Sequence, residues 1–174
     1  MSLKELTQDN HQRAEETPFM KAIFTGTLPI DAWADFTFQK SYIYTVIENI
    51  ARSNSLLEDL EGIERARLLL EDANEMNGHT PPKLKTATIE YVHYLVGLNN
   101  YPERILAHLY VWHMGDLFGG QMIKRAIQAP HRALDFENAD LLKAIIRAKL
   151  NDTMADEANV AFNWAIKLLE EYTI

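Results

Sequence analysis

The 174-residue sequence contains no cysteine, which excludes disulfides, thiolate metal ligands and cysteine nucleophiles. It has no apolar run of the roughly 18 residues that a membrane-spanning helix needs, and no N-terminal region typical of a signal peptide. Basic residues are outnumbered by acidic ones, 17 against 25, so the formal net charge is −8. This charge disfavours sequence-independent nucleic-acid binding, because the electrostatic interaction would be repulsive. We expect a soluble, cytoplasmic protein with neither a membrane nor a nucleic-acid partner.

Strand and hairpin patterns are missing as well. Nearly every segment repeats its apolar residues with the 3.6-residue period of an α-helix. Helices are expected over residues 2–14, 17–26, 31–52, 63–76, 80–98, 102–130 and 139–172, the last one bent near 151–152. The length and the 47% hydrophobic content suit one globular unit. We therefore predict a single all-α domain spanning residues 1–174.

Glycine is scarce, yet three of the seven glycines lie in the segment Gly115-Asp-Leu-Phe-Gly-Gly-Gln121, inside an expected helix. Each costs about 1 kcal/mol relative to alanine in a helix interior. A helix keeps such residues where another group must come closer than a Cβ allows. That group could be a second helix in a close crossing, or a flat ligand. Asp116 could deliver protons beside such a ligand, or could satisfy free backbone groups at a kink.

Two histidines have spacings that suggest metal ligation. His11 lies on the apolar face of the first helix, where a neutral imidazole could ligate haem iron; a hydrogen-bonded core or boundary histidine is the alternative. Glu90 and His93 have the Glu-x-x-His spacing of di-iron bundles, but the sequence lacks the second copy that such a site needs. The other histidines are expected at packing boundaries or exposed beside turns, at positions 108, 113, 79 and 131.

Four blocks, in order along the chain, resemble segments of the haem oxygenase family. They are Leu3–Glu15 with Pro18–Lys21 for the proximal helix, Tyr110–Gln121 for the distal helix, Lys143–Asn151 for the helix at the haem propionates, and Ala161-Phe162 for the pocket wall. The resemblance implies an all-α fold that holds haem between a proximal N-terminal helix and a glycine-kinked distal helix.

The resemblance also implies site residues. His11 would be the iron ligand, with Glu15 beside it. The backbone of Gly115 and Gly119 would lie over the distal face, where Asp116 would hold the water that delivers protons. Further contacts to haem are implied for two wall residues, one more glycine and three cations for the propionates: Tyr110, Phe162, Gly120, Lys4, Lys143 and Arg147.

The activity that the resemblance implies uses haem as both substrate and cofactor. Haem would be opened with O₂ and electrons to biliverdin, as the IXα isomer, with carbon monoxide and Fe²⁺. The sequence carries no flavin or nicotinamide motif, so electrons must come from outside; the family implies ferredoxin, and a bilin reductase could take the product. An acidic ferredoxin needs a basic face, for which the candidates are Lys21, Lys40, Lys124, Arg125, Lys143 and Lys149.

Two alternatives remain open: a non-catalytic haem-binding protein on the same fold, and a haem-free relative of di-iron or thiamin-salvage type. Three residues also depart from the family pattern. Phe118 stands where serine is frequent, Trp112 where arginine is frequent, and His113 replaces an aromatic residue. We expect these changes to alter the distal polar network, with His113 as a further hydrogen-bonding group there.

Overall fold

The computed structural model describes residues 1–78 and 80–174; His79, expected to be exposed, lies outside the described residues. The regular elements of the described part are helices, as predicted. In chain order they are α1 (Leu3–Leu6), α2 (Gln8–Glu15), α3 (Pro18–Phe24), α4 (Ile30–Ser53), α5 (Ala66–Asn77), α6 (Thr86–Val96), α7 (Pro102–Phe118), α8 (Gly120–Ala126), η1 (Arg132–Leu134), α9 (Ala139–Lys149), η2 (Asp152–Met154) and α10 (Ala155–Glu170).

Three main differences separate the expected helices from the structure. The helix expected over residues 2–14 is divided at Thr7 into α1 and α2. The single helix expected over 102–130 is two helices, because α7 ends and α8 begins on either side of Gly119. The helix expected from residue 80 begins at Thr86. Pro82 disfavours helical backbone in the residue before it. The Gln39 side chain then holds the segment that follows, donating to the Lys83 carbonyl at 2.9 Å and accepting from the Lys85 amide at 3.0 Å. The last region bends where predicted, at the short helix η2 between α9 and α10.

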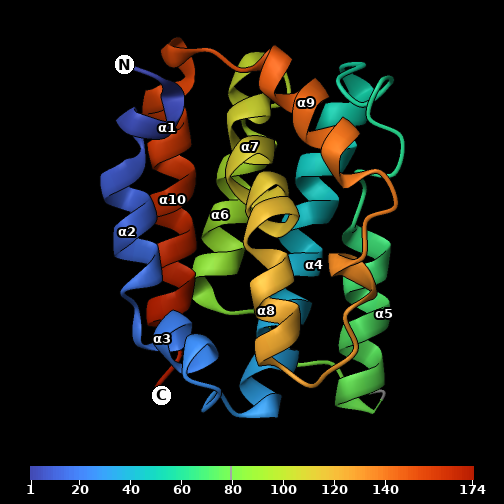
Figure 1. Ribbon diagram of the computed structural model, residues 1–174. Coiled ribbons are helices and arrows are strands. Elements are labelled where there is room, and N and C mark those ends of the chain that lie inside the picture. The colour runs from blue at the N-terminus through green and yellow to red at the C-terminus, as the bar shows by residue number, and fades with distance from the viewer. Residues whose placement is uncertain (79) are drawn as a thin grey trace.

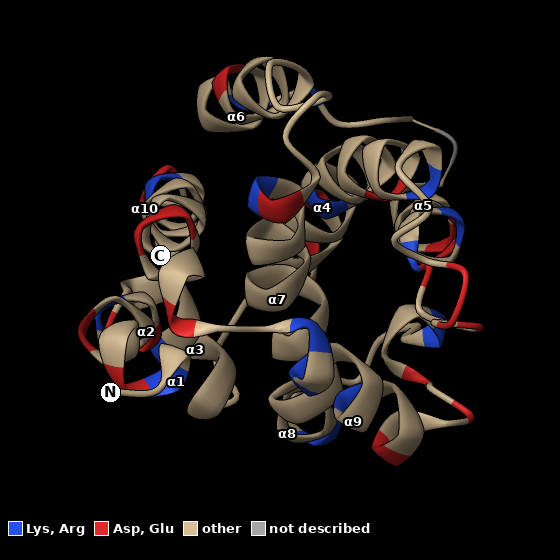
Figure 2. Cartoon of the chain, turned by 90° about the horizontal axis from the view of Figure 1, so that it is seen from above, with Lys and Arg blue, Asp and Glu red and all other residues tan. Residues whose placement is uncertain are grey.

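The helices pack around α7, which runs through the middle of the molecule (Figure 1). Viewed along the helix axes, α1, α2, α3 and α10 are grouped on one side of α7, and α4 and α5 lie on the other (Figure 2). Apart from α2, which has no buried residue, these helices all contribute to the buried core. In α4, the positions that face it are spaced as one helical stripe: Phe36, Ile43, Ile47 and Ile50.

Local contacts fix the N-terminal segment against α10. A capping box opens α1: the Ser2 side chain accepts from the Glu5 amide at 3.3 Å, and the Glu5 carboxylate accepts from the Ser2 amide at 2.6 Å. Asn159 then holds both helices, accepting from Asn10 Nδ2 at 2.9 Å and donating to the Leu6 carbonyl at 3.2 Å. These bonds fix α1 and α2 on α10, which in turn packs against α7. Within the described chain, no helix is both long and apolar enough to cross a membrane.

Candidate functional site: a cavity between α2 and α7

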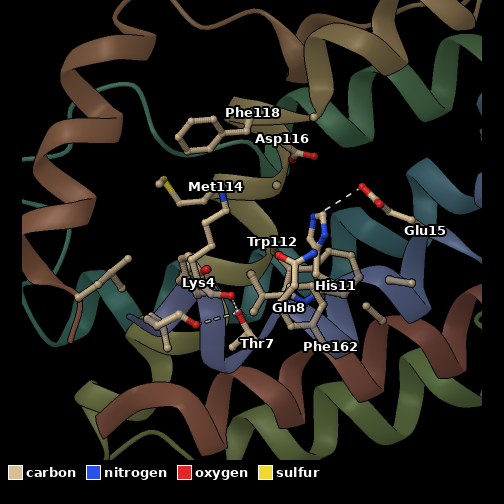
Figure 3. A pocket seen from close by; sticks show the side chains of 18 of the residues that line it. Lys4, Thr7, Gln8, His11, Glu15, Trp112, Met114, Asp116, Phe118 and Phe162 are labelled. Atoms are coloured by element: carbon tan, nitrogen blue, oxygen red, sulfur yellow. Dashed lines mark hydrogen bonds and ion pairs between the residues drawn. The ribbon is translucent and has the colours of Figure 1, made fainter. Parts of the chain in front are cut away.

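A cavity of about 950 Å³ lies between the N-terminal helices and α7. This volume is at the upper end of the range for small-molecule sites, roughly 300–1,000 Å³. Most of its wall is apolar, and polar groups enter at a few points only (Figure 3). The cavity can therefore hold a large, mainly apolar molecule that is oriented by a small number of polar contacts.

His11 lies on the α2 wall of this cavity. Its side chain is 51% exposed, so His11 is not a core histidine. The imidazole Nε2 lies 3.7 Å from Oε1 of Glu15, and the Phe162 ring meets the imidazole edge-on at 5.9 Å between centroids (Figure 3). All three residues line the cavity. Glu15 and Phe162 thus restrict the orientation of an imidazole that remains open to a ligand.

The structure gives different reasons for the glycines at positions 115, 119 and 120, near the junction of α7 and α8. A Cβ added at Gly115 would meet no heavy atom within 4 Å, so no protein packing requires a glycine there. At Gly119 the added Cβ would lie 3.2 Å from the Gly115 carbonyl oxygen. At Gly120 it would lie 3.0 Å from Cδ2 of Leu134. Close packing therefore accounts for Gly120, whereas Gly115 leaves open space in the cavity.

Gly120 was expected at the haem, and the structure places it elsewhere: it is buried against η1 and does not line the cavity. Gly115 and Gly119 do line it, as does Tyr110. The reason is the break between α7 and α8, because the segment after Gly119 turns toward Leu134.

Asp116 is buried at the cavity edge and carries two protein partners. Its Oδ1 accepts from Lys40 Nζ at 2.7 Å, and its Oδ2 accepts from the Tyr44 hydroxyl at 2.5 Å. Burial, together with the Asp116 charge, raises the pKa of Tyr44 well above its usual value, so the phenol keeps its proton. The expectation that Lys40 belongs to a surface docking face is wrong, since only 7% of its side chain is exposed and it lines the cavity. Sequence reasoning missed both Lys40 and Tyr44 as site residues.

The expected propionate cations divide into two groups. Lys4 and Arg147 line the cavity, but Lys143 does not. The Lys143 ammonium instead lies 4.5 Å from the ring centroid of Phe118, whose other neighbour is the Arg147 guanidinium at 4.9 Å. Phe118 lines the cavity and is 46% exposed. Its ring holds both cations by cation–π contact.

The two other departures from the family pattern also differ in position. Trp112 lines the cavity and donates from Nε1 to the Tyr91 hydroxyl at 2.9 Å. His113 is fully buried, pairs through Nε2 with Glu48 at 2.9 Å, and does not line the cavity. The expectation of a distal hydrogen-bonding group at His113 is therefore wrong: its ring points to α4.

Glu90, the carboxylate of the Glu-x-x-His spacing considered for a di-iron site, pairs with Lys167 at the surface.

The fold and cavity define a helical protein with room for a large ligand between a histidine on an N-terminal helix and the bare backbone of a central helix. The chain belongs to the Heme oxygenase family, whose model matches residues 1–143. It is 28% identical to heme oxygenase 2 of Macaca fascicularis over 203 residues, which cover 97% of this chain and 63% of the relative. It is 26% identical to the heme oxygenase of Guillardia theta, covering 98% of this chain and 84% of that one.

Solved structures share the fold. The crystal structure of heme oxygenase-1 from Synechocystis in complex with heme has a TM-score of 0.88 at 22% identity, covering 97% of this chain and 89% of that one. The heme oxygenase of Leptospira interrogans has a TM-score of 0.84 at 24% identity, covering 98% and 97%. The predicted all-α fold is thus confirmed. The chain spans less than two thirds of the length of the mammalian relative.

Proposed function

We propose that this chain is a haem oxygenase, which binds haem in the cavity and opens it with O₂ and electrons to biliverdin IXα, carbon monoxide and Fe²⁺. One observation carries the proposal. The His11 imidazole and the bare backbone of Gly115 line the same cavity from different helices, and no protein atom lies where a Cβ of Gly115 would be. Family membership and the likeness to a structure solved with heme support the same conclusion.

The residues present fit haem. A neutral imidazole is the common iron ligand in all-α pockets, and His11 is the histidine that reaches this cavity in the described chain. The apolar side chains of the lining would surround a flat ring system, and Lys4 and Arg147 would supply cations for two carboxylates. The space beside Gly115 admits a flat group at backbone distance.

When bound, haem would supply the iron that activates O₂ and would itself be the ring that is opened. The protein would then provide orientation and protons. His11 would hold the iron from the α2 side, while Lys4 and Arg147 would fix the rotation of the ring. On the α7 side, each oxygen of Asp116 already accepts a protein hydrogen bond. Lys40 has three N–H donors and gives one to Asp116, so its ammonium is the group with donors left for water in the cavity.

Electrons would come from a ferredoxin that docks on a basic face. With Lys40 removed from the expected set, five residues remain: Lys21, Lys124, Arg125, Lys143 and Lys149. Lys124 pairs with Asp135 and Lys149 with Asp59, which reduces their local field. The Lys and Arg positions of α8 and α9, blue in Figure 2, nevertheless lie near one another along the two neighbouring helices. We propose this face, α8 with α9, as the docking site. A bilin reductase as product acceptor and a cytoplasmic location stay predictions.

Product analysis separates this function from the alternative of a non-catalytic haem-binding protein. The haem-loaded chain is given reduced ferredoxin or ascorbate in air, and the pigment is identified by chromatography. We expect biliverdin from the wild-type chain, and a much lower yield from Asp116→Ala with haem affinity nearly unchanged. Asp116→Asn is the matched variant of similar size. Haem that stays bound and intact in the wild-type chain would establish the non-catalytic alternative.

A further inference from the structure

A hydrogen-bonded row of side chains leads away from the cavity wall at Trp112. Trp112 Nε1 donates to the Tyr91 hydroxyl at 2.9 Å, and this hydroxyl lies 2.5 Å from Nδ1 of His108. On the far side of the ring, His108 Nε2 lies 2.7 Å from Oε1 of Glu157. Glu157 also accepts from Arg104 at 2.9 Å, and that guanidinium is partly exposed. The row therefore connects the cavity with the surface beside α6 and α10.

The direction of every hydrogen bond in the row is fixed. An indole N–H can only donate, so the Tyr91 oxygen accepts from Trp112. An ionised Glu157 carboxylate can only accept, so His108 carries its proton on Nε2 and donates it to Glu157. The other nitrogen of the neutral ring, Nδ1, then accepts from the Tyr91 hydroxyl. Burial raises the pKa of Glu157, but hydrogen bonds from His108, Tyr94 and Arg104 outweigh it and lower that pKa to about 2. Burial lowers the pKa of His108, so a neutral base faces the phenol.

The same tyrosine is stacked between two indoles. The Tyr91 ring lies 6.1 Å from Trp112 at an interplanar angle of 28°, and 5.4 Å from Trp164 at 13°. Trp112 lines the cavity, Tyr91 is 1% exposed, and Trp164 is a half-buried residue of α10 that faces α6. Three oxidisable rings in contact thus span the distance from the cavity to the surface, and the middle one has its own proton acceptor.

We propose that Tyr91 is a redox-active tyrosine that carries oxidising equivalents out of the cavity. An oxidant in the cavity takes one electron from Trp112, which is refilled by Tyr91. The Tyr91 O–H bond breaks, its proton moves to His108 Nδ1, and a neutral tyrosyl radical remains beside an imidazolium that the Glu157 carboxylate stabilises. A reductant in solution, such as a thiol or ascorbate, returns the electron through Trp164. The proton then returns from His108 to the Tyr91 oxygen.

The oxidant is hydrogen peroxide, which would act on haem held in the cavity. Two passages through the row deliver two electrons, and with two protons from solvent they reduce one hydrogen peroxide to two waters. The protein is unchanged at the end. The proposal goes beyond the opening of haem: it concerns how oxidising equivalents that miss the substrate leave the site without damaging it.

Charges favour Tyr91 over its neighbours as the place where the radical rests. Tyr44 also contacts Trp112, with centroids 6.0 Å apart, but the Lys40 ammonium lies 5.1 Å from the Tyr44 ring centroid. A cation over an aromatic face disfavours removal of an electron from that ring. The Lys167 ammonium lies 5.0 Å from the Trp164 ring centroid and acts in the same way. Removal of an electron is thus harder at Tyr44 and at Trp164 than it would be without these cations.

Two initiators test the proposal on the full chain. In the first arm, without haem, a photoexcited ruthenium tris-bipyridine complex with persulfate oxidises the protein from solution, and samples frozen at short times are examined by electron paramagnetic resonance. We expect a neutral tyrosyl radical that disappears in Tyr91→Phe. It should persist in Tyr44→Phe, and in Tyr42→Phe, which removes an exposed tyrosine. A signal that survives Tyr91→Phe, or that disappears in Tyr44→Phe, overturns the proposal.

In the second arm, hydrogen peroxide is added to the haem-loaded chain. Trp112→Phe should remove the radical in this arm and leave it in the photochemical arm. Trp164→Phe should do the reverse: it should suppress the photochemical radical and lengthen the lifetime of the peroxide radical, because the electron returns more slowly. Both variants keep Tyr91, so the crossed result does not depend on the folding of Tyr91→Phe. Equal effects of either variant in both arms contradict the row. The photochemical arm stands even where haem binding fails.

Discussion

Lys40 Nζ lies 2.7 Å from Oδ1 of Asp116, and the two side chains are only 7% and 6% exposed. One charge comes from the middle of α4 and the other from α7, so the pair joins two helices at the edge of the cavity. The polar group on the α7 side of the cavity is therefore the Lys40–Asp116 ion pair rather than an isolated carboxylate. Water and ligand in the cavity meet an ammonium whose position the carboxylate fixes.

Removing one member of this pair should destabilise the protein. Lys40→Met keeps most of the side-chain volume but leaves the Asp116 carboxylate buried without its cation. We expect a loss of about 3 kcal/mol in the free energy of unfolding, the lower end for a broken buried pair, because the cavity gives water some access. The double variant Lys40→Met/Asp116→Asn should recover much of that loss. Urea denaturation measures all three chains, and equal stability of Lys40→Met and wild type would show that the pair has no such role.

Gly115 and Gly120 provide a matched pair of alanine substitutions. Gly115→Ala places a methyl group in open space within a helix, so the haem-free protein should gain about 0.5–1 kcal/mol. Haem affinity should fall by roughly tenfold, because the methyl group occupies ligand space. Gly120→Ala forces Leu134 to move and should cost about 1 kcal/mol, with haem affinity unchanged.

Thermal denaturation of the haem-free chains and haem titration separate the two glycine effects. If Gly120→Ala weakens haem binding more than Gly115→Ala, the assignment of the cavity wall is wrong.

Glu157 should make stability depend on acid pH. Its pKa in the folded protein is about 2, below the ordinary 4.5, so the unfolded chain binds its proton more readily. The stabilisation is complete above pH 4.5 and is lost as the pH falls toward 2. Glu157→Gln should flatten the decline in this window, whereas Glu137→Gln, at an exposed glutamate, should leave it unchanged. Urea midpoints between pH 7 and pH 3 provide the test; a Glu157→Gln curve parallel to wild type would refute it.

Reversal of charge at the proposed docking face should weaken ferredoxin-driven turnover. Arg125→Glu changes an exposed residue of α8. We expect a higher KM for ferredoxin, most marked at low salt, because the local field steers an acidic partner. Turnover with ascorbate should not change. Arg67→Glu on α5 is the matched control outside the predicted set. Identical KM values for the two variants would remove α8 from the docking face.

The fold was largely predictable because helical periodicity is a local property of the sequence. The errors fall where tertiary contacts decide. The segment 102–130 reads as one amphipathic helix, yet it breaks at Gly119, where the following residues pack on Leu134. No local pattern contains that contact.

His11 and Gly115, singled out by helical position, glycine content and family resemblance, do line the cavity, and their roles toward haem stay predictions. Lys40 was assigned to the surface because lysine is rarely buried, and its partner Asp116 lies 76 residues away in the sequence. Lys143 has the spacing of a ligand cation, but the Phe118 ring takes it. Lys40 and Tyr44 are one helical turn apart on the apolar stripe of α4. A lysine followed by a tyrosine on such a stripe is the sequence pattern that could have indicated the pair.

The most direct test of the proposed function is an anaerobic titration with ferric haem, followed by ascorbate or reduced ferredoxin in air, with the absorption spectrum recorded throughout. The account predicts stoichiometric binding with an intense Soret band, and a changed Soret band in His11→Ala. In the wild-type chain, the Soret band should then disappear as the broad red band of biliverdin appears. The absence of saturable haem binding would contradict it.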